Sequence, residues 1–343
     1  MDKMKSISKQ VSIYDIAKKA GVSPITVSRV LNNKSASIKA RTRVLNEAKN
    51  LGYVPNVRAA SLRRSYNKSI GLLIPDISNP VYPIMVKAIH DIARRQGYYL
   101  ILGNTYGNVE EELEILQRMA QERIAGLVLA TGEEDDSPCN PYLMKMIGMG
   151  IHVILTGRAR NGLKADEVMT ASAPGVYRAV NYLLKIGREK VAFLAGKRGL
   201  LATEQRFAGY RKALSENGVA PDEKLLSFGE DWSMESGKKQ MKDLLKANKI
   251  VDAVFCGNDL MAIGAMDTIQ KKGLKVPDDI AVIGFDDIEL ASLVRPRLTT
   301  VVQHQEKVAS TACSLLLDRI EGRQTGEPKE ILIESELTIR ESA

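Results

Sequence analysis

The spacing of apolar residues along the chain indicates a repeating order of strands and helices from Ser69 onward. Short apolar runs of the kind that form buried strands occur at Ile70–Ile74, Tyr99–Leu102, Gly126–Leu129, Val153–Leu155, Val191–Leu194, Ala253–Cys256 and Ile280–Phe285. Windows with apolar residues at helical spacing separate them at Pro83–Gln96, Glu110–Gln121, Val176–Ile186, Glu204–Glu216, Glu235–Ala247 and Leu260–Lys271. This alternation predicts β-α-β units. The expected fold class is therefore α/β, with doubly wound parallel sheets that carry helices on both faces.

The alternating region is too long for one ordinary domain, so we expect two lobes within a core that spans residues 67–343. The segment Leu298–Gln303 and a helix at Glu306–Gly322 are predicted to return toward the first lobe, and Ile331–Ile339 has the pattern of a last strand. We therefore expect a first lobe of about residues 67–164 and 295–325, and a second lobe of about residues 165–294 and 326–343.

Residues 11–55 have the apolar spacing of a small all-α domain that precedes the core. Ser12 and Asp15 have the spacing of a capping box at the start of a first helix. Gly21 follows that helix, where a positive φ is least costly for glycine. One face of the helix carries Ile13, Ile16, Ala17 and Ala20.

A second helix is predicted directly after the glycine turn. Ser23 can cap it, and Pro24 suits its first position, where a missing N–H costs nothing. Its apolar face carries Val27, Val30 and Leu31, whereas its outer face carries Ile25, Thr26, Ser28 and Arg29. A third helix is expected at Ala40–Leu51, with Val44, Leu45, Ala48 and Leu51 on one side. Two short helices joined by a tight turn are typical of a DNA-reading helix-turn-helix, and the alternative is an ordinary helical hairpin.

Two further segments flank this helical domain. Residues 1–10 are polar and predicted to be a disordered tail. Residues 56–66 form a short basic segment that begins with Asn56, a good helix-capping residue. A helix of this length is marginal in water by itself, so we expect a linker that becomes helical only where something holds it.

The charge distribution supports a polyanion as the partner of the N-terminal part. Residues 1–66 hold 14 basic and 3 acidic residues, whereas the rest of the 343-residue chain holds 35 basic and 38 acidic residues. A basic module joined to a nearly neutral globule fits attachment to nucleic acid through the first part alone. A basic arm without sequence specificity would show the same asymmetry.

Other sequence features favour no metal, cofactor or membrane. Cys139, Cys256 and Cys313 are isolated, and the 3 histidines are scattered, so no metal-ligand spacing or disulfide framework is expected. No stretch has the apolar core of a signal peptide, and no apolar run is long enough to span a bilayer. We therefore expect a cytoplasmic protein without a cofactor.

Eight segments together make the chain resemble the lac-repressor-like (LacI/GalR) family of bacterial transcription regulators. They are Ile13–Ala17, Gly21–Ser23, Thr26–Asn32, Leu51–Asn56, Pro75–Pro80, Asn258–Gly264, Val282–Asp287 and Leu298–Val301. The resemblance covers essentially the whole chain after residue 11. It implies a helix-turn-helix domain, a hinge helix at residues 56–66 and a two-lobed core like that of periplasmic sugar-binding proteins. It also implies a homodimer that binds operator DNA under the control of a small-molecule effector.

The family pattern implies a DNA-binding surface on the second helix and the hinge. The implied residues are Ser23, Pro24, Ile25, Thr26, Ser28, Arg29, Asn32, Asn33, Arg41, Asn56, Arg58, Ala59 and Leu62. Arg29 can contact guanine or a phosphate, and Asn32, Asn33 and Arg41 are expected on phosphates. Leu62 is expected to open a central base step in the minor groove. Pro24 and Ile25 have no side-chain hydrogen-bonding groups, so the base sequence that they read stays open.

An effector site is expected beyond the carboxyl ends of the strands, where open α/β sheets bind ligands. The candidate residues are Asp76, Tyr82, Thr131, Arg158, Arg206, Trp232, Asn258 and Asp286. Carboxylate, amide and guanidinium groups beside an indole suit a polyhydroxylated ring. Where many family members carry an Asp-Asn pair, this chain has Ala171 and Ser172. Lys197 and Arg198, together with Arg158, lead to the hypothesis of an anionic effector such as a sugar acid or sugar phosphate.

Three rival functions remain to be weighed. An enzyme is disfavoured because the chain has no Gly-x-Ser-x-Gly motif, P-loop or metal-ligand spacing. A sugar-binding receptor without a DNA role is disfavoured by the basic N-terminal part. A regulator controlled by a protein partner is not excluded. Residues 335–343 show no apolar heptads, so we expect a dimer rather than a tetramer joined by a terminal coiled coil.

Overall fold

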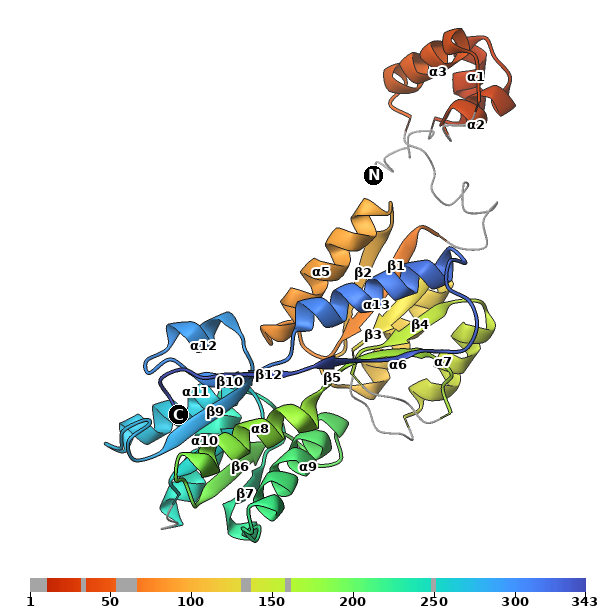
Figure 1. The fold of residues 1–343 in the computed structure, drawn as a ribbon. Coiled ribbons are helices and arrows are strands. Elements are labelled where there is room, and N and C mark those ends of the chain that lie inside the picture. The colour runs from red at the N-terminus through yellow and green to blue at the C-terminus, as the bar shows by residue number, and fades with distance from the viewer. Residues whose placement is uncertain (1–10, 32–34, 54–66, 131–136, 158–161, 248–250) are drawn as a thin grey trace, which may run out of the picture. The chain divides into compact units, whose positions relative to one another are not determined.

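In the computed structural model, the described residues are 11–31, 35–53, 67–130, 137–157, 162–247 and 251–343 (Figure 1). They belong to two units, Met1–Ser65 and Tyr66–Ala343, and each unit is described by itself. The predicted tail at residues 1–10 and the predicted hinge at residues 56–66 lie outside the described residues.

The first unit contains the three predicted helices, α1 (Ile13–Ala20), α2 (Pro24–Leu31) and α3 (Ile38–Asn50). The capping box forms as predicted, because the Asp15 carboxylate accepts a hydrogen bond from Ser12 N at 2.8 Å and Asp15 N donates to Ser12 Oγ at 3.3 Å. Gly21 has a φ of 61°, as the turn requires. The side chains that close the core are Ile16, Ala17, Ala20, Val27, Val30, Val44 and Ala48.

Two details of the third helix differ from the prediction. It begins at Ile38 rather than Ala40, because Ser37 Oγ accepts a hydrogen bond from Ala40 N at 3.3 Å and so caps it two residues earlier. Leu45 was expected on the apolar side but is 47% exposed. The three helices of so small a domain bury only a narrow stripe, which Val44 and Ala48 already fill.

In the second unit, the first sheet has six strands in the order β11-β5-β4-β3-β1-β2, and every pair is parallel. The strands are β1 (Ser69–Ile74), β2 (Tyr99–Asn104), β3 (Gly126–Leu129), β4 (His152–Leu155), β5 (Asp166–Ala171) and β11 (Glu330–Glu334). Its helices are α5 (Val81–Arg95), α6 (Val109–Gln121), α7 (Cys139–Gly148) and α13 (Gln305–Ile320). Ile70, Leu72 and Ile74 pack toward α5 and α13, whereas Leu73 packs toward α6 and α7. Both faces of the sheet are therefore covered, as the continuous apolar run of β1 predicts.

The second sheet has the order β12-β10-β9-β8-β6-β7, and only β12 runs antiparallel to its neighbour in the described pairings. The strands are β6 (Val191–Ala195), β7 (Leu226–Phe228), β8 (Ala253–Cys256), β9 (Ala281–Asp286), β10 (Thr299–Val302) and β12 (Glu336–Thr338). Helices α8 (Ser172–Lys185) and α9 (Leu201–Glu216) cover one face, and α10 (Met234–Lys246) and α11 (Asp259–Lys271) cover the other. The short helix α12 (Glu289–Leu293) follows β9.

The predicted lobe boundaries are wrong in three places. Strand β5 belongs to the first sheet, although its residues were assigned to the second lobe, because it pairs with β4 and β11. Strand β10 belongs to the second sheet, although its residues were assigned to the first lobe. The single expected strand at Ile331–Ile339 divides at Ser335 into β11 of the first sheet and β12 of the second.

The chain therefore passes between the two sheets three times, and the three crossing segments are joined by hydrogen bonds. Thr170 Oγ1 donates to Gln303 O at 2.8 Å, and Ser335 Oγ donates to Ala171 O at 2.8 Å. Gly175 permits this approach, because a Cβ there would lie 2.4 Å from Ser335 Oγ. The crossing segments thus form one hydrogen-bonded connection between the lobes. We call it the inter-lobe hinge, and it is distinct from the predicted hinge at residues 56–66.

Candidate functional site

The outer face of α2 presents the side chains that sequence reasoning placed there. Ile25 is 67% exposed and Arg29 is exposed, whereas Thr26 and Ser28 are half-buried. Ser23 Oγ accepts a hydrogen bond from Thr26 N at 3.2 Å, so Ser23 serves as a helix cap whatever else it contacts. Pro24 is the first residue of α2, and Arg41 lies half-buried on α3. Asn32, Asn33, Asn56, Arg58, Ala59 and Leu62 lie outside the described residues.

In the second unit, a cavity of about 150 Å³ lies where the carboxyl ends of both sheets meet. Among its lining residues are five of the eight predicted effector contacts, namely Tyr82, Arg206, Trp232, Asn258 and Asp286. Residues from both lobes and from the second crossing segment complete the wall. They include Asn79, Val81, Met85, Ala130, Thr156, Met169, Thr170, Ser172, Gln205, Gln303 and Gln305.

Of the other three predicted contacts, Asp76 is not part of the described wall. Asp76 shapes the turn before α5, since its carboxylate accepts hydrogen bonds from Ser78 N at 2.9 Å and Ser78 Oγ at 2.7 Å. Thr131 and Arg158 lie outside the described residues.

The cations behind the hypothesis of an anionic effector are also placed elsewhere. Lys197 and Arg198 are exposed and do not line the cavity. Arg198 Nε donates to Glu204 Oε1 at 3.0 Å, and its guanidinium lies over the Phe207 and Phe228 rings. Neither Lys197 nor Arg198 therefore supplies positive charge to the described cavity wall, whereas Arg158, the third cation of that hypothesis, lies outside the described residues.

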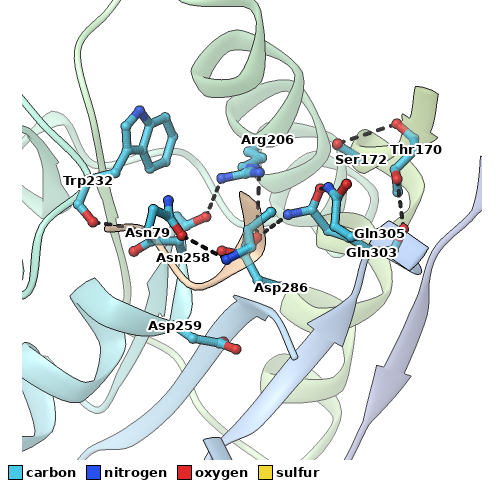
Figure 2. Close-up of polar contacts among 12 residues, drawn as sticks. Asn79, Thr170, Ser172, Arg206, Trp232, Asn258, Asp259, Asp286, Gln303 and Gln305 are labelled. Carbon is cyan, nitrogen blue, oxygen red and sulfur yellow. Dashed lines mark hydrogen bonds and ion pairs between the residues drawn. The ribbon is translucent and has the colours of Figure 1, made fainter. Parts of the chain in front are cut away.

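Two of the lining residues, Arg206 and Asp286, form a buried ion pair (Figure 2). Arg206 Nη2 lies 3.9 Å from Asp286 Oδ1, and Arg206 Nη1 donates to Gly257 O at 2.5 Å. The guanidinium also packs 4.0 Å from the Phe285 ring centroid and 4.9 Å from that of Trp232. Asp286 holds a φ of 130°, which turns its side chain from the end of β9 toward Arg206.

The Asp286 carboxylate also connects the ion pair to the inter-lobe hinge. Gln303 Nε2 donates to Asp286 Oδ1, and Gln305 Nε2 donates to Gln303 Oε1 at 2.7 Å. Gln303 O in turn accepts the hydrogen bond from Thr170 (Figure 2). The described side chains thus form a continuous path from the cavity to two of the crossing segments.

Burial sets the acid–base properties of this cluster. It raises the pKa of Asp286, Arg206 opposes that rise, and nearby Asp259 adds to it. Burial also raises the pKa of Asp259 to about 7, while hydrogen bonds from Thr300 Oγ1 and Ile288 N oppose the rise. Desolvation lowers the pKa of Arg206, and the Asp286 carboxylate counteracts it. Arg206 and Asp286 therefore depend on each other for their charged states.

Asn258 and Trp232 are held by local packing. Asn258 caps α11, because its Oδ1 accepts from Met261 N at 2.9 Å, and its Nδ2 donates to Trp232 O at 2.9 Å. The Trp232 indole lies against two glycines, since a Cβ at Gly196 or Gly257 would come within 2.6 or 2.7 Å of the ring. These contacts fix the indole at the cavity wall.

Sequence reasoning missed several lining residues, above all Gln303, Gln305 and Thr170. Gln303 follows β10, which had been predicted only as part of a segment returning toward the first lobe, so the carboxyl-end argument that selected Asp286 was not applied to it. Thr170 could not be found in this way, because β5 had not been recognised as a strand.

None of the helices in the described part of the chain has the length and apolar character needed to cross a membrane.

Comparison with known proteins agrees with this architecture. Residues 12–56 match the pattern described as "Bacterial regulatory proteins, lacI family", and residues 180–343 match that of a "Periplasmic binding protein-like domain". The HTH-type transcriptional regulator GalR of Escherichia coli (strain K12) is 34% identical over 317 residues, covering 92% of this chain and 91% of the relative. The HTH-type transcriptional repressor PurR of Erwinia tasmaniensis is 36% identical over 332 residues, covering 94% and 95%.

Solved structures show the same likeness over nearly the whole chain. The lac repressor dimer bound to operator and the anti-inducer ONPF has a TM-score of 0.86 at 28% identity, covering 97% of this chain and 99% of that one. The complex of the transcriptional regulator CelR with cellobiose has a TM-score of 0.74 at 30% identity, covering 97% and 100%. The named relatives are transcription regulators rather than enzymes. With relatives above 30% identity over more than nine-tenths of its length, this chain belongs to the LacI family and is a DNA-binding transcription regulator.

Proposed function

We propose that the protein is a repressor that binds its operator as a homodimer and changes operator affinity when a small, sugar-like effector occupies the cavity between the lobes. The observation that carries this proposal is the path from Arg206 and Asp286 through Gln303 to Thr170. A ligand that contacts the ion pair would act directly on residues that join the lobes.

The DNA side of the proposal rests on α2. Ile25 and Arg29 are exposed on a helix whose opposite face is buried, so the helix can enter a major groove without unfolding its domain. Ile25 would make apolar contact, and Arg29 would bind guanine or a phosphate. Hinge residues 56–66 are proposed to pair in the minor groove, with Leu62 as the wedge. The similar lac repressor dimer has been solved on its operator.

The effector side rests on the chemistry of the cavity. Amide, hydroxyl and carboxylate groups lie beside the Trp232 indole, which suits a ring with hydroxyls on its edges and C–H bonds on its face. The similar CelR structure is a complex with a sugar, cellobiose. Binding would change the angle between the lobes and hence the spacing of the paired hinges. Such effector-linked changes usually correspond to about 1–3 kcal/mol of coupling.

Binding-site selection with the full-length protein tests the DNA function. We expect one enriched, approximately palindromic sequence, because a two-fold symmetric dimer reads two half-sites. Arg29→Ala should lose the enrichment, whereas Lys212→Ala, on the exposed surface of α9, should retain it. Enrichment of no sequence would contradict the proposal. Once the operator is known, titration of candidate effectors against the protein–operator complex shows whether a small molecule controls binding.

A further inference from the structure

The hydrogen bonds around the cavity restrict the chemistry of the ligand more than the residue types do. Three hydroxyl groups of the wall already donate their protons to backbone carbonyls. Thr156 Oγ1 donates to Leu129 O at 3.3 Å, Thr170 Oγ1 to Gln303 O at 2.8 Å, and Ser172 Oγ to Thr170 O at 3.4 Å. Since a hydroxyl has a single proton, these oxygens can only accept from a ligand.

The amide groups of the wall differ from these hydroxyls. Gln303 Nε2 donates to Asp286, Gln303 Oε1 accepts from Gln305 Nε2, and Asn79 Oδ1 accepts from Val81 N at 3.2 Å. Because an amide nitrogen has two protons, each of these bonds leaves at least one N–H of the amide for a ligand. Among the described side chains, the clear unused donor at the ion pair is Arg206 Nε, which is buried without a partner. The wall therefore offers both donors and acceptors, and its three committed hydroxyls require donors from the ligand.

The charges of the wall cancel. Arg206 and Asp286 are the charged side chains among the described lining residues, and they pair with each other at 3.9 Å. Among these described residues, an anionic ligand would meet no uncompensated cation, and its oxygens, which only accept, could not bond to the three hydroxyls that also only accept. Burying such a charge without a partner is strongly unfavourable.

One part of the wall is apolar. Val81 and Met85 lie one turn apart on α5, Ala130 follows β3, and Met169 lies on β5. Val81, Met85 and Ala130 are buried, and they belong to or adjoin the core of the first lobe. A ligand group directed at this patch gains from being apolar and loses when it carries a hydroxyl without a partner.

The inference from these observations concerns the ligand of the proposed effector site and rests on that proposed function. We propose that the effector is an uncharged polyol with an apolar edge, of the deoxy-sugar class, rather than a sugar acid or sugar phosphate. Its hydroxyls contact the Arg206–Asp286 pair and the acceptor oxygens of Thr156, Thr170 and Ser172. Its deoxygenated edge lies against Val81, Met85, Ala130 and Met169.

A series of sugars that differ only at carbon 6 tests this proposal by calorimetric titration of the full-length protein. For each of the D-galactose, D-glucose and D-mannose configurations, the series comprises the 6-deoxyhexose, the hexose, the hexuronic acid and the hexose 6-phosphate. We expect one configuration to bind, with the 6-deoxyhexose about tenfold tighter than the hexose and the two anions weaker still by at least another tenfold.

Two matched variants locate the apolar edge. Met169→Gln should reduce the preference for the 6-deoxyhexose about tenfold. Leu332→Gln is the control, because Leu332 pairs with Met169 in the sheet register but is exposed and does not line the cavity.

The proposal is overturned by tighter binding of a uronic acid or a phosphate, by an unchanged preference in Met169→Gln, or by no binding of any member. Operator selection reports separately on the regulator function, so enrichment of an operator together with any of these results would reject this ligand class alone.

Discussion

Gly196→Ala is a minimal change that tests how the cavity is built. A Cβ at this position would lie 2.6 Å from Trp232 Cε2 and 2.9 Å from Cδ2 and Nε1. Favourable contacts between carbon atoms fall near 3.5–4.0 Å, so the indole must move by on the order of 1 Å. Gly196 is not among the positive-φ residues, so the backbone itself accepts alanine. The whole effect is therefore steric and falls on one side chain.

The expected magnitude follows from overpacking of a well-packed site. Such substitutions cost about 1–3 kcal/mol in unfolding free energy, which lowers Tm by roughly 2–12 °C in a unit of this size. A displacement of the indole disturbs its contact with Arg206, whose guanidinium is 4.9 Å from the ring centroid. We therefore also expect effector affinity to fall at least about tenfold, a loss of about 1.4 kcal/mol, while operator binding without effector is kept.

The assay is direct, because Trp232 is the chain's single tryptophan. Urea unfolding gives the stability, and the emission spectrum of the folded protein reports the new indole environment. Gly148→Ala is the matched control, since a Cβ there meets nothing within 4 Å and its φ is not positive. Adding Trp232→Phe to Gly196→Ala should recover part of the stability. A Gly196→Ala protein with the stability of the control and an unshifted spectrum would refute this account of the cavity.

Three further predictions address the predicted hinge at residues 56–66, a buried ion pair and the pH dependence of stability. Leu62→Ala should weaken operator binding and DNA bending in gel-shift titrations while leaving the unfolding curve and effector binding unchanged. An unchanged operator affinity would contradict the proposal that Leu62 opens a base step. Arg319→Met should lower the unfolding free energy measured in urea by about 3–5 kcal/mol, because it leaves the Asp166 carboxylate buried without its cationic partner. Arg319 donates two hydrogen bonds to Asp166, at 2.8 and 2.7 Å, and both side chains are almost fully buried. Adding Asp166→Asn should recover part of that loss, and no recovery would contradict the pairing argument. Burial raises the pKa of Asp259 from an ordinary value near 4 to about 7, so the folded state binds this proton more tightly than the unfolded state does. The resulting stabilisation is complete below about pH 4 and is lost as the pH rises through 7; the difference in unfolding free energy between pH 5 and pH 8 should therefore shrink in Asp259→Asn, and an unchanged difference would exclude Asp259 as its source.

The helical domain was predictable because its signals are local. The capping box of Ser12 and Asp15, the glycine turn and the apolar face of α2 act within a few residues of one another. Leu45 is the exception, since its exposure depends on how much surface two neighbouring helices cover. Local propensity cannot report that quantity.

The effector cavity was predictable only in part. Asp286 and Asn258 follow strongly apolar strands, so the rule that ligands bind at carboxyl ends of strands finds them. Arg198 illustrates the limit of such reasoning. It also follows an apolar strand, but Glu204 and two aromatic rings hold it away from the cavity. Whether a loop cation faces a ligand depends on partners that lie elsewhere along the chain.

The sequence by itself determined the fold class, the division into a basic helical domain and an α/β core, and the membership of a regulator family. These properties follow from periodicity, caps and charge, which are written in short windows. Only the tertiary structure decided which sheet β5, β10, β11 and β12 join, and thus where the inter-lobe hinge lies. A strand of mixed polarity such as β5 is defined by the neighbours with which it pairs, and those neighbours come from distant parts of the chain.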